Sequence, residues 1–249
     1  MRRMIVTATG LARSYGEGEA TVHALAGVDV AFPEGAFTAI MGPSGSGKST
    51  LMHLLAGLDR PTAGSVVLAG TELAELGDKE LTALRRDKVG FIFQSFNLLP
   101  VLTAEENILL PLSIAGAKPD QEWVDRLIET VGLRDRLGHR PAELSGGQQQ
   151  RVAVARALAS QPAVVFADEP TGNLDSKTSA EVMELLRRSV DEFGQTIVMV
   201  THDPRAAAYA DRLIELEDGK VIRDGVPAAA EVTEPRSGTS PSDAMTRGA

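Results

Sequence analysis

The alternation of hydrophobic and polar positions predicts strands towards both ends of the chain and helices in its middle. β-Branched and alternating apolar positions predict strands at residues 4–12, 22–32, 36–41, 64–70, 88–93, 163–169 and 195–203. Apolar positions at helical spacing predict helices at residues 49–58, 103–116, 120–132, 148–160 and 179–193. Two short apolar runs, 212–219 and 220–225, are expected to form a hairpin.

This order of elements predicts an α/β fold with a parallel core sheet. The early strands are expected to form an antiparallel β layer on the N-terminal side, and residues of about 95–160 an inserted helical subdomain. The folded domain is expected to span residues 1–226. Residues 227–249 are rich in Ala, Pro, Ser, Thr and Gly with little apolar content, which predicts a disordered tail.

Composition narrows the classes of function. The chain has 249 residues, of which 43% are hydrophobic, enough for a sizeable core. The formal net charge of −9 argues against a nucleic-acid-binding surface as the main function. The absence of cysteine excludes disulfides and thiolate metal sites and fits a cytoplasmic protein. No apolar stretch reaches the length of a membrane span, so a function at a membrane would require docking through a partner.

The stretch "GPSGSGKST" (42–50) follows a predicted strand and opens a predicted helix, which is the context of a phosphate-binding P-loop. Gly42, Gly45 and Gly47 allow backbone N–H groups to point at phosphate oxygens, and the helix N-terminus adds its dipole. Lys48 is expected to reach the β- and γ-phosphates, and the Ser49 hydroxyl to bind Mg²⁺. Other expected nucleotide contacts are Ser44, Ser46 and Thr50. This motif alone leaves kinases and GTPases open.

Polar residues follow three of the predicted strands. The strand "VVFADE" (164–169) ends in Asp168, which is placed to hold Mg²⁺, and Glu169, which could polarise an attacking water as a general base. Gln94 and His202 also follow strands, where α/β proteins bind ligands. Tyr15 could stack on a base. Each of these residues, taken alone, is more typical of a turn, the core or the surface.

A second anion-binding feature precedes the helix at 148–160. In "ELSGGQQQR" (143–151), a serine cap and two glycines, Ser145, Gly146 and Gly147, leave backbone N–H groups free to face an anion. The P-loop already provides a phosphate site. The residues alone therefore leave open what this second cradle would hold.

This set of motifs resembles the nucleotide-binding subunit of ABC transporters. It comprises residues 42–50, Gln94, "LSGGQ" at 144–148, "VVFADE" at 164–169, "NLD" at 173–175 and His202. Their order and spacing match over about residues 4–225, and "LSGGQ" is highly specific to the family. The resemblance implies a P-loop ATPase cassette that uses ATP and Mg²⁺ and drives a transporter.

In this family two cassettes pack head to tail with two ATP molecules between them. The resemblance implies that Ser145, Gly146, Gly147 and Gln148 grip the nucleotide of a second cassette, which for a lone complete cassette favours a homodimer. It also implies that Lys48, Gln94, Glu169 and His202 are catalytic, with Glu169 as the base. The remaining implied roles are adenine stacking for Tyr15, contact with Mg²⁺ and the water for Gln94, γ-phosphate sensing for His202 and communication across the interface for Asp175.

A finer resemblance lies in residues 93–112 and 141–151, which are similar to cassettes of the macrolide-efflux and lipoprotein-release branch. It implies a permease subunit that docks near residues 94–112 and holds the chain on the inner face of the cell membrane. The apolar residues expected to form the docking groove are Phe96, Leu98, Leu99 and Leu102. Export, extraction and mechanotransmission all remain open, because the permease selects the cargo.

Two alternatives use the same motifs: a soluble ABC ATPase acting on DNA or ribosomes, and a regulatory protein that binds ATP without turnover. Chromosome-structuring and repair members split the cassette with a long coiled coil, and ribosome-acting members carry two cassettes. This chain has no heptad run and a single signature. The presence of Glu169 and His202 argues against a cassette without turnover.

Overall fold

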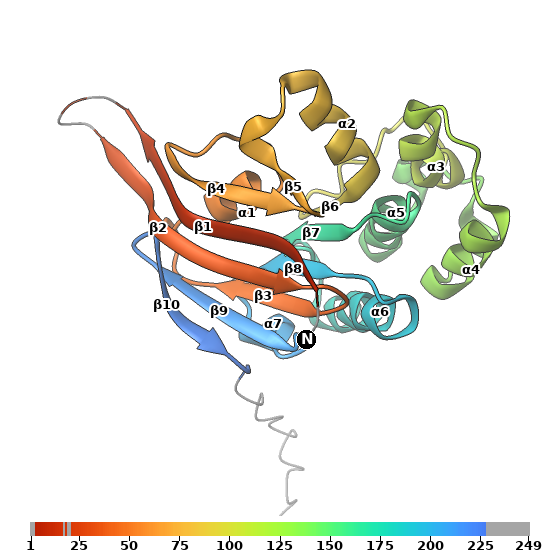
Figure 1. The fold of residues 1–249 in the computed structure, drawn as a ribbon. Coiled ribbons are helices and arrows are strands. Elements are labelled where there is room, and N and C mark those ends of the chain that lie inside the picture. The colour runs from red at the N-terminus through yellow and green to blue at the C-terminus, as the bar shows by residue number, and fades with distance from the viewer. Residues whose placement is uncertain (1–2, 17, 19–20, 228–249) are drawn as a thin grey trace, which may run out of the picture.

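The computed structural model describes residues 3–16, 18 and 21–227, which form two sheets and a group of helices (Figure 1). Apart from Pro227, the predicted disordered tail at 227–249 lies outside the described residues. Across the described part of the chain, no helix combines the length and the apolar character that crossing a membrane requires.

A six-stranded sheet forms the centre of the molecule, in the order β10–β9–β3–β8–β7–β6. Its strands are β3 (Phe37–Met41), β6 (Val89–Phe93), β7 (Val164–Asp168), β8 (Ile197–Val200), β9 (Arg212–Glu217) and β10 (Lys220–Gly225). All neighbours pair in parallel except β10, which forms the expected hairpin with β9. The sequences of β7 and β8, "VVFAD" and "IVMV", are almost wholly buried, as expected of parallel strands covered on both faces.

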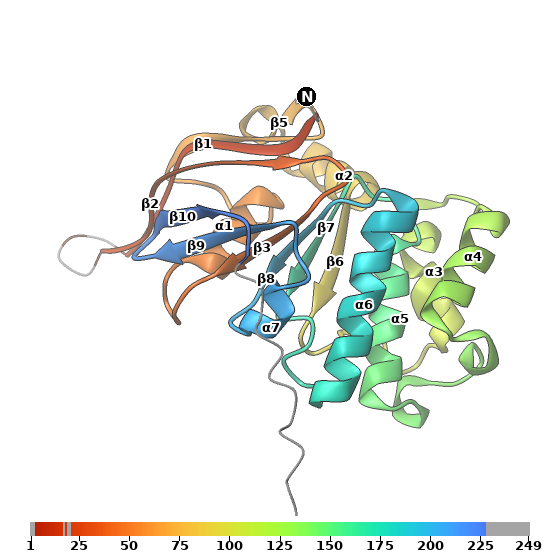
Figure 2. The same ribbon diagram turned by 90° about the horizontal axis from the view of Figure 1, so that it is seen from below.

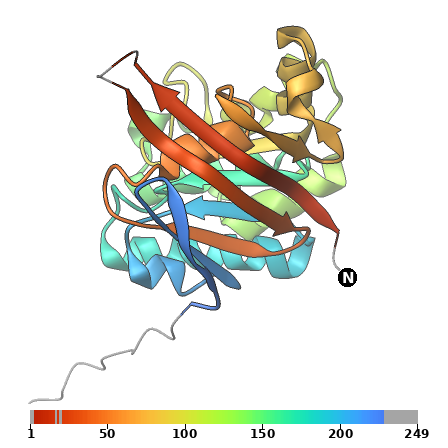
Figure 3. The same ribbon diagram turned by 60° about the vertical axis from the view of Figure 1, so that its left-hand side comes forward.

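A four-stranded antiparallel sheet lies over this centre, in the order β2–β1–β4–β5. Its strands are β1 (Met4–Tyr15), β2 (Val22–Pro33), β4 (Ala63–Leu68) and β5 (Thr71–Glu72). Figure 3 shows the long β1–β2 pair crossing the molecule diagonally. Helix α1 (Lys48–Leu55) buries its apolar face in one cluster with residues of both sheets, among them Val6, Phe32, Ile40 and Phe166. This packing holds the N-terminus of α1 close to the end of β3.

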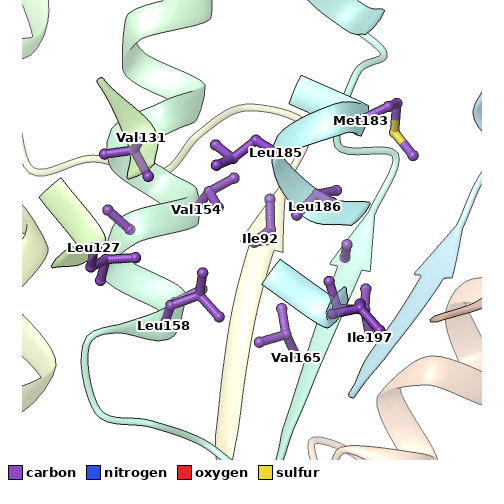
Figure 4. Packing of buried hydrophobic residues seen from close by; sticks show 14 of the residues in the cluster. Ile92, Leu127, Val131, Val154, Leu158, Val165, Met183, Leu185, Leu186 and Ile197 are labelled. Atoms are coloured by element: carbon purple, nitrogen blue, oxygen red, sulfur yellow. The ribbon is translucent and has the colours of Figure 1, made fainter. Parts of the chain in front are cut away.

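Helices cover the face of the central sheet opposite α1. They are α3 (Ala104–Ala115), α4 (Gln121–Val131), α5 (Gly146–Leu158), α6 (Ser176–Phe193) and the short α7 (Pro204–Ala207). Figure 2 shows α6 and α5 side by side, with α3 and α4 beyond α5. In Figure 4, Ile92 and Val165 of the sheet lie in one cluster with Val154 and Leu158 of α5 and Leu186 of α6. The cluster fixes α5 against the strands whose ends carry the candidate site residues.

The α/β class, the parallel core sheet and the antiparallel layer are confirmed. The sequence pattern does not predict α2 (Asp78–Lys88), because Leu81 is its only buried residue. Helices α5 and α6 begin earlier than predicted, because Ser145 and Asp175 cap them. Short 3₁₀ turns also occur at Leu73–Glu75, Arg134–Arg136 and Pro141–Glu143. Helices α3, α4 and α5 fall within the range expected for a helical subdomain, and the domain limits themselves stay a prediction.

Candidate functional site

The loop between β3 and α1 has the backbone of a phosphate cradle. Gly42, Gly45 and Gly47 have φ values of 154°, 81° and 100°, which residues with a side chain rarely adopt. A Cβ at Gly42 would come within 3.0 Å of the Leu216 carbonyl oxygen, and one at Gly47 within 3.0 Å of the Ala24 carbonyl oxygen. At Gly45 a Cβ would meet no protein atom within 4 Å. The loop therefore needs glycine for its backbone angles at all three positions and for space at two of them.

The first turn of α1 presents hydrogen-bond donors. Gly47 is the N-cap, and no side chain among the described residues caps this end. The N–H groups of Lys48, Ser49 and Thr50 have no acceptor within the helix and are left for a ligand. The Lys48 ammonium donates to the carbonyls of Gly42 (2.9 Å) and Pro43 (2.7 Å). These donors, together with the helix dipole, make the loop suited to an anion.

A cavity of about 420 Å³ opens over this loop. It brings together nine of the predicted site residues: Ser44, Gly45, Gly47, Lys48, Ser49, Thr50, Asp168, Glu169 and His202. Val22, His23 and Ala24 of β2 also line it, although the sequence pattern does not single them out. Only the tertiary packing of β2 against Gly47 places them there.

Gly42 and Ser46 lie behind the loop rather than in the cavity. Gly42 packs against the backbone of Leu216. Ser46 is 2% exposed, and its hydroxyl has no hydrogen-bond partner within the described part of the chain. The Ser46 N–H donates to the Pro43 carbonyl (3.2 Å), and the Ser46 carbonyl accepts from the Gly219 N–H (3.1 Å). These two predicted contact residues shape the cradle from behind.

The ends of β7 and β8 carry the three chemically active side chains of the cavity. Burial raises the pKa of the Asp168 carboxyl, and the nearby charges of His53 and Lys48 oppose that shift. Glu169 Oε1 lies 2.8 Å from His202 Nδ1. The hydrogen bond and the negative charge of Glu169 raise the pKa of His202. The structure thus joins two residues that the sequence placed on separate strands.

The backbone of Glu169 adopts a turn that few non-glycine residues use, with φ of 47°. Its N–H donates to the Val200 carbonyl at 2.9 Å, and its carbonyl accepts from the Gly172 N–H at 3.0 Å. The left-handed backbone costs about 1–2 kcal/mol. These bonds compensate for that cost and direct the Glu169 carboxylate into the cavity.

Gln94 follows β6 but does not line the cavity. Its side-chain amide donates to Asn173 Oδ1 (3.2 Å), and the Asn173 amide donates back to the Gln94 carbonyl (3.0 Å). A Cβ at Gly172 would lie 2.6 Å from the Gln94 amide nitrogen, so the glycine makes room for this contact. Of the three predicted metal ligands, the structure therefore brings together Ser49 and Asp168 but not Gln94.

Helix α5 begins at the second predicted cradle. The Ser145 hydroxyl accepts from the Gln148 N–H (3.3 Å), and the Gln148 side chain accepts from the Ser145 N–H (2.9 Å). This reciprocal cap leaves the N–H groups of Gly146 and Gly147 unengaged by either side chain. A Cβ at Gly147 would overlap Thr178, so glycine permits close packing of α5 on α6. The cradle does not line the cavity over the P-loop.

Asp175 caps α6. Its carboxylate accepts from the Thr178 hydroxyl (2.6 Å) and from the N–H groups of Lys177 (3.0 Å) and Thr178 (3.1 Å). These hydrogen bonds, that of the Thr178 hydroxyl first, lower the pKa of Asp175. The structure therefore gives Asp175 a local role, and its predicted role across an interface stays a prediction.

Tyr15 lies beside the cavity without lining it. Its hydroxyl donates to Asp59 (2.9 Å), and the Arg13 guanidinium lies 4.5 Å from the centre of its ring. Its partner across the β1–β2 ladder is Val22, which does line the cavity. Stacking of Tyr15 on an adenine therefore stays a prediction.

A second hollow, of about 400 Å³, lies between α2, β6, α3 and α5. Apolar residues line it, including Phe91, Phe93 and Pro111, and two of them, Leu58 and Ile114, are 46% and 70% exposed. Arginine side chains reach it from α2 and α5: Arg85, Arg86 and Arg156.

The docking groove expected at Phe96, Leu98, Leu99 and Leu102 stays a prediction, and these residues do not line the hollow. The reason is the buried side chain of Asn107. Its oxygen accepts from the Leu99 N–H (2.8 Å), and its nitrogen donates to the Leu99 and Leu102 carbonyls (3.1 and 3.2 Å). These bonds draw the segment onto the start of α3, and Leu98 packs against the core.

Two residues of α5 that the sequence pattern does not single out reach the loops of the site. Arg156 donates to the carbonyls of Phe96 (2.8 Å) and Asn97 (2.6 Å), and its burial lowers its pKa. Gln150 is fully buried and donates to the carbonyl of Pro170. The only signal for either residue in the sequence is a polar residue among the apolar positions of a helix.

Comparison with known proteins finds relatives along most of the chain. A family model described as "ABC transporter" matches residues 25–172. The macrolide export ATP-binding/permease protein MacB of Marinobacter nauticus is 50% identical over 224 residues, which are 89% of this chain and 35% of that protein. The chain thus spans about a third of the length of that relative.

The lipoprotein-releasing system ATP-binding protein LolD of Legionella pneumophila is 47% identical over 223 residues, which are 89% of this chain and 98% of that protein. Among solved structures, the dimeric post-hydrolysis state of the ATP-binding cassette MJ0796, bound to ADP and Pi, matches with a TM-score of 0.79 and 45% identity. The match covers 90% of this chain and 99% of that one.

Proposed function

The chain belongs to the ABC transporter family, and from that premise we propose that it binds and hydrolyses ATP as one half of a cassette dimer that drives a separate membrane subunit. The observation that supports this most directly is the shared cavity of the P-loop, Asp168, Glu169 and His202. It combines an anion cradle with a carboxylate and an imidazole in hydrogen-bond contact. That combination suits hydrolysis of a phosphoanhydride.

The triphosphate binds at the loop and the first turn of α1. The N–H groups of Lys48, Ser49 and Thr50 donate to phosphate oxygens, and the Lys48 ammonium exchanges its two loop carbonyls for β- and γ-phosphate oxygens. Charge-assisted hydrogen bonds of this kind are stronger than those to neutral carbonyls. The adenine lies along the β2 wall of the cavity, and Tyr15 stacks on it.

The donor atoms of the cavity fit Mg²⁺ bound together with a nucleotide. Ser49 offers a hydroxyl and Asp168 a carboxylate, both hard oxygen ligands. Within the described residues no three His, Cys, Asp or Glu side chains form a metal cage, and Mg²⁺ usually takes few protein ligands and completes its shell with phosphates and waters. When bound, the ion neutralises charge on the β- and γ-phosphates. Gln94 does not line the cavity, so its side-chain oxygen would have to turn towards it to join this site.

Glu169 is the general base of the proposed reaction. Its carboxylate accepts a proton from a water that attacks the γ-phosphorus, while the bond to the ADP oxygen breaks. In the present geometry that carboxylate is held by His202, whose side chain is 73% exposed while that of Glu169 is 19% exposed. Movement of the exposed His202 towards the γ-phosphate frees Glu169 for the water. Nucleotide binding and activation of the base are thereby coupled.

The second cradle serves the nucleotide of another cassette. Gly146 and Gly147 do not line the cavity of their own chain, and Gly147 packs closely against Thr178 of α6, so we expect a nucleotide in that cavity to lie out of reach of this cradle. A second copy of the chain, packed head to tail, would bring the phosphate of its own bound nucleotide to this cradle. A dimeric arrangement is described for the related cassette MJ0796. Asp175, at the start of α6 beside the signature, would lie near that interface.

The membrane subunit docks in the hollow between α2, β6, α3 and α5. An amphipathic segment would cover the exposed Leu58 and Ile114. The hollow adjoins the segment after Gln94, because Arg156 contacts both the hollow and the carbonyls of Phe96 and Asn97. Docking there would place the chain in the cytoplasm, on the inner face of the membrane. The likeness to LolD and MacB favours the branch of transporters expected from residues 93–112.

The experiment is a comparison of the wild type with Glu169→Gln in Mg-ATP. Loss of the base should lower hydrolysis about 10²- to 10⁴-fold, while ATP binding persists because the P-loop donors are untouched. The variant should accumulate as a dimer in size-exclusion chromatography, since removal of a negative charge near the γ-phosphate favours closure. Glu129→Gln, which alters an exposed carboxylate on α4 that does not line the cavity, is the matched control and should behave as the wild type. A wild type that neither binds nor hydrolyses ATP would refute the proposed function.

A further inference from the structure

We propose that Gln150 is a positioning residue that holds the loop of the general base to helix α5. This inference rests on the proposed hydrolysis of ATP with Glu169 as the base. Gln150 lies in the second turn of α5, five residues after the cap Ser145, and is 0% exposed. Its side-chain amide donates to the carbonyl of Pro170, the residue that follows Glu169.

The hydrogen bond to Pro170 fixes the orientation of the Gln150 side chain and uses only the nitrogen of its amide. Exchange of the amide nitrogen and oxygen would set two acceptors against each other, so the carbonyl of Pro170 fixes the orientation. The Gln150 oxygen then has no hydrogen-bond partner within the described part of the chain. A buried polar atom without a partner destabilises a fold and requires an explanation. We therefore attribute the presence of glutamine here to what its N–H₂ group holds rather than to stability.

Gln150 holds a stretch of backbone, Glu169 and Pro170, that includes a conformation few non-glycine residues adopt. Glu169 has φ of 47°, its N–H is bonded to the Val200 carbonyl, and its own carbonyl is bonded to the Gly172 N–H. Pro170 has no N–H, so its carbonyl is the only backbone group of that residue that can be anchored. Gln150 anchors it from α5. The bonds to β8, within the turn and to α5 together determine where the Glu169 carboxylate lies.

Helix α5 thereby links two parts of the site. Its first turn carries the cradle for the nucleotide of the second cassette, and its second turn grips the loop of this subunit's own base. A helix is stiff over two turns, so the position of the cradle relative to the loop of the base is maintained. Without Gln150 the Glu169 turn keeps its bonds to Val200 and Gly172 but loses its attachment to α5. A shift of about 1 Å in a reacting group can cost about 10²-fold in rate.

The matched control is Gln195, a second buried glutamine that donates to a proline carbonyl. It is 8% exposed, it does not line the cavity, and its amide donates to the carbonyls of Pro162 (3.2 Å) and Thr196 (3.1 Å). Gln150→Leu and Gln195→Leu each remove the same kind of buried hydrogen bond. Both should therefore lower the thermal unfolding temperature. Only Gln150→Leu should change catalysis.

The experiment measures kcat, KM for ATP, and ATP binding for the wild type and both variants of the purified chain. Gln150→Leu should lower kcat about 10- to 100-fold and change KM less than about threefold, because the P-loop is intact. Combined with Glu169→Gln, it should still form the ATP-bound dimer. If Gln150→Leu does not fold, Gln150→Met, which keeps the unbranched shape, tests the same prediction.

Two results would overturn the inference while leaving the proposed function standing. One is an active wild type with equal kcat for the Gln150 and Gln195 variants. The other is a Gln150 variant whose KM rises with kcat unchanged. An inactive wild type would instead refute the proposed function itself.

Discussion

Two glycines of the P-loop should respond to alanine in different ways. Both Gly45 and Gly47 have left-handed backbones, with φ of 81° and 100°. A Cβ at Gly47 would overlap the Ala24 carbonyl oxygen on β2, whereas a Cβ at Gly45 would meet no protein atom and Gly45 lines the cavity. We therefore expect Gly47→Ala to act mainly on folding and Gly45→Ala mainly on nucleotide binding.

The magnitudes follow from these contacts. Placing alanine in a left-handed backbone costs about 1–2 kcal/mol, which is the whole expected loss for Gly45→Ala. Gly47→Ala adds overpacking against backbone that cannot move aside, about 1–3 kcal/mol more. For a chain of this size each kcal/mol lowers the unfolding temperature by about 2–4 °C. Gly45→Ala should also weaken ATP binding about 10- to 100-fold, the loss expected for one charge-assisted hydrogen bond.

The assay combines thermal unfolding, followed by circular dichroism without nucleotide, with ATP titration at a temperature where both variants are folded. The expected result is a larger fall in unfolding temperature for Gly47→Ala and a clear loss of affinity for Gly45→Ala. Equal unfolding temperatures would show that the close approach of Ala24 to the loop does not exist in solution. Wild-type affinity in Gly45→Ala would show that phosphate does not bind at this loop.

Three other predictions test the site. Lys48→Ala should weaken ATP binding strongly in an isothermal titration, because it removes the cation that the β- and γ-phosphates require; unchanged affinity would contradict the P-loop assignment. Ser145→Arg should bind ATP normally yet not hydrolyse it, and mixing it with Lys48→Ala should restore some activity if the cradle acts on the partner's nucleotide. His202 should titrate above the ordinary histidine pKa of about 6.5, and Glu169→Gln should lower its pKa in an NMR titration. Because the pKa of His202 is raised in the folded state, the stabilisation from the Glu169–His202 pair is complete below about pH 6.5 and is lost as the pH rises through the raised pKa. A His202 pKa that Glu169→Gln leaves unchanged would refute the contact.

The sequence alone determined the features that depend on neighbouring residues. The P-loop is a run of consecutive residues whose glycines, lysine and serine act through local backbone geometry, so residues 42–50 were recognisable without a fold. Strands such as 164–169 were recognisable because a buried parallel strand is apolar throughout. The family assignment, which the comparisons confirm, rested on the same local motifs. The serine cap of α5 was recognised locally at Ser145, whereas the cap of α6 at Asp175 was not, because the apolar periodicity of that helix begins later.

Only the tertiary structure decided which of these residues meet. Glu169 and His202 are 33 positions apart, and Gln94 and Asn173 are 79 apart. Their contacts exist because β6, β7 and β8 pair in parallel and end at the same edge of one sheet. The β2 wall of the cavity and the grip of Gln150 on Pro170 depend in the same way on packing between distant elements. Apolar periodicity predicts that one face of an element is buried. It does not predict which element covers that face, because many apolar surfaces would bury it equally well. The pairing of the strands and the packed cluster around α5 determine the partner.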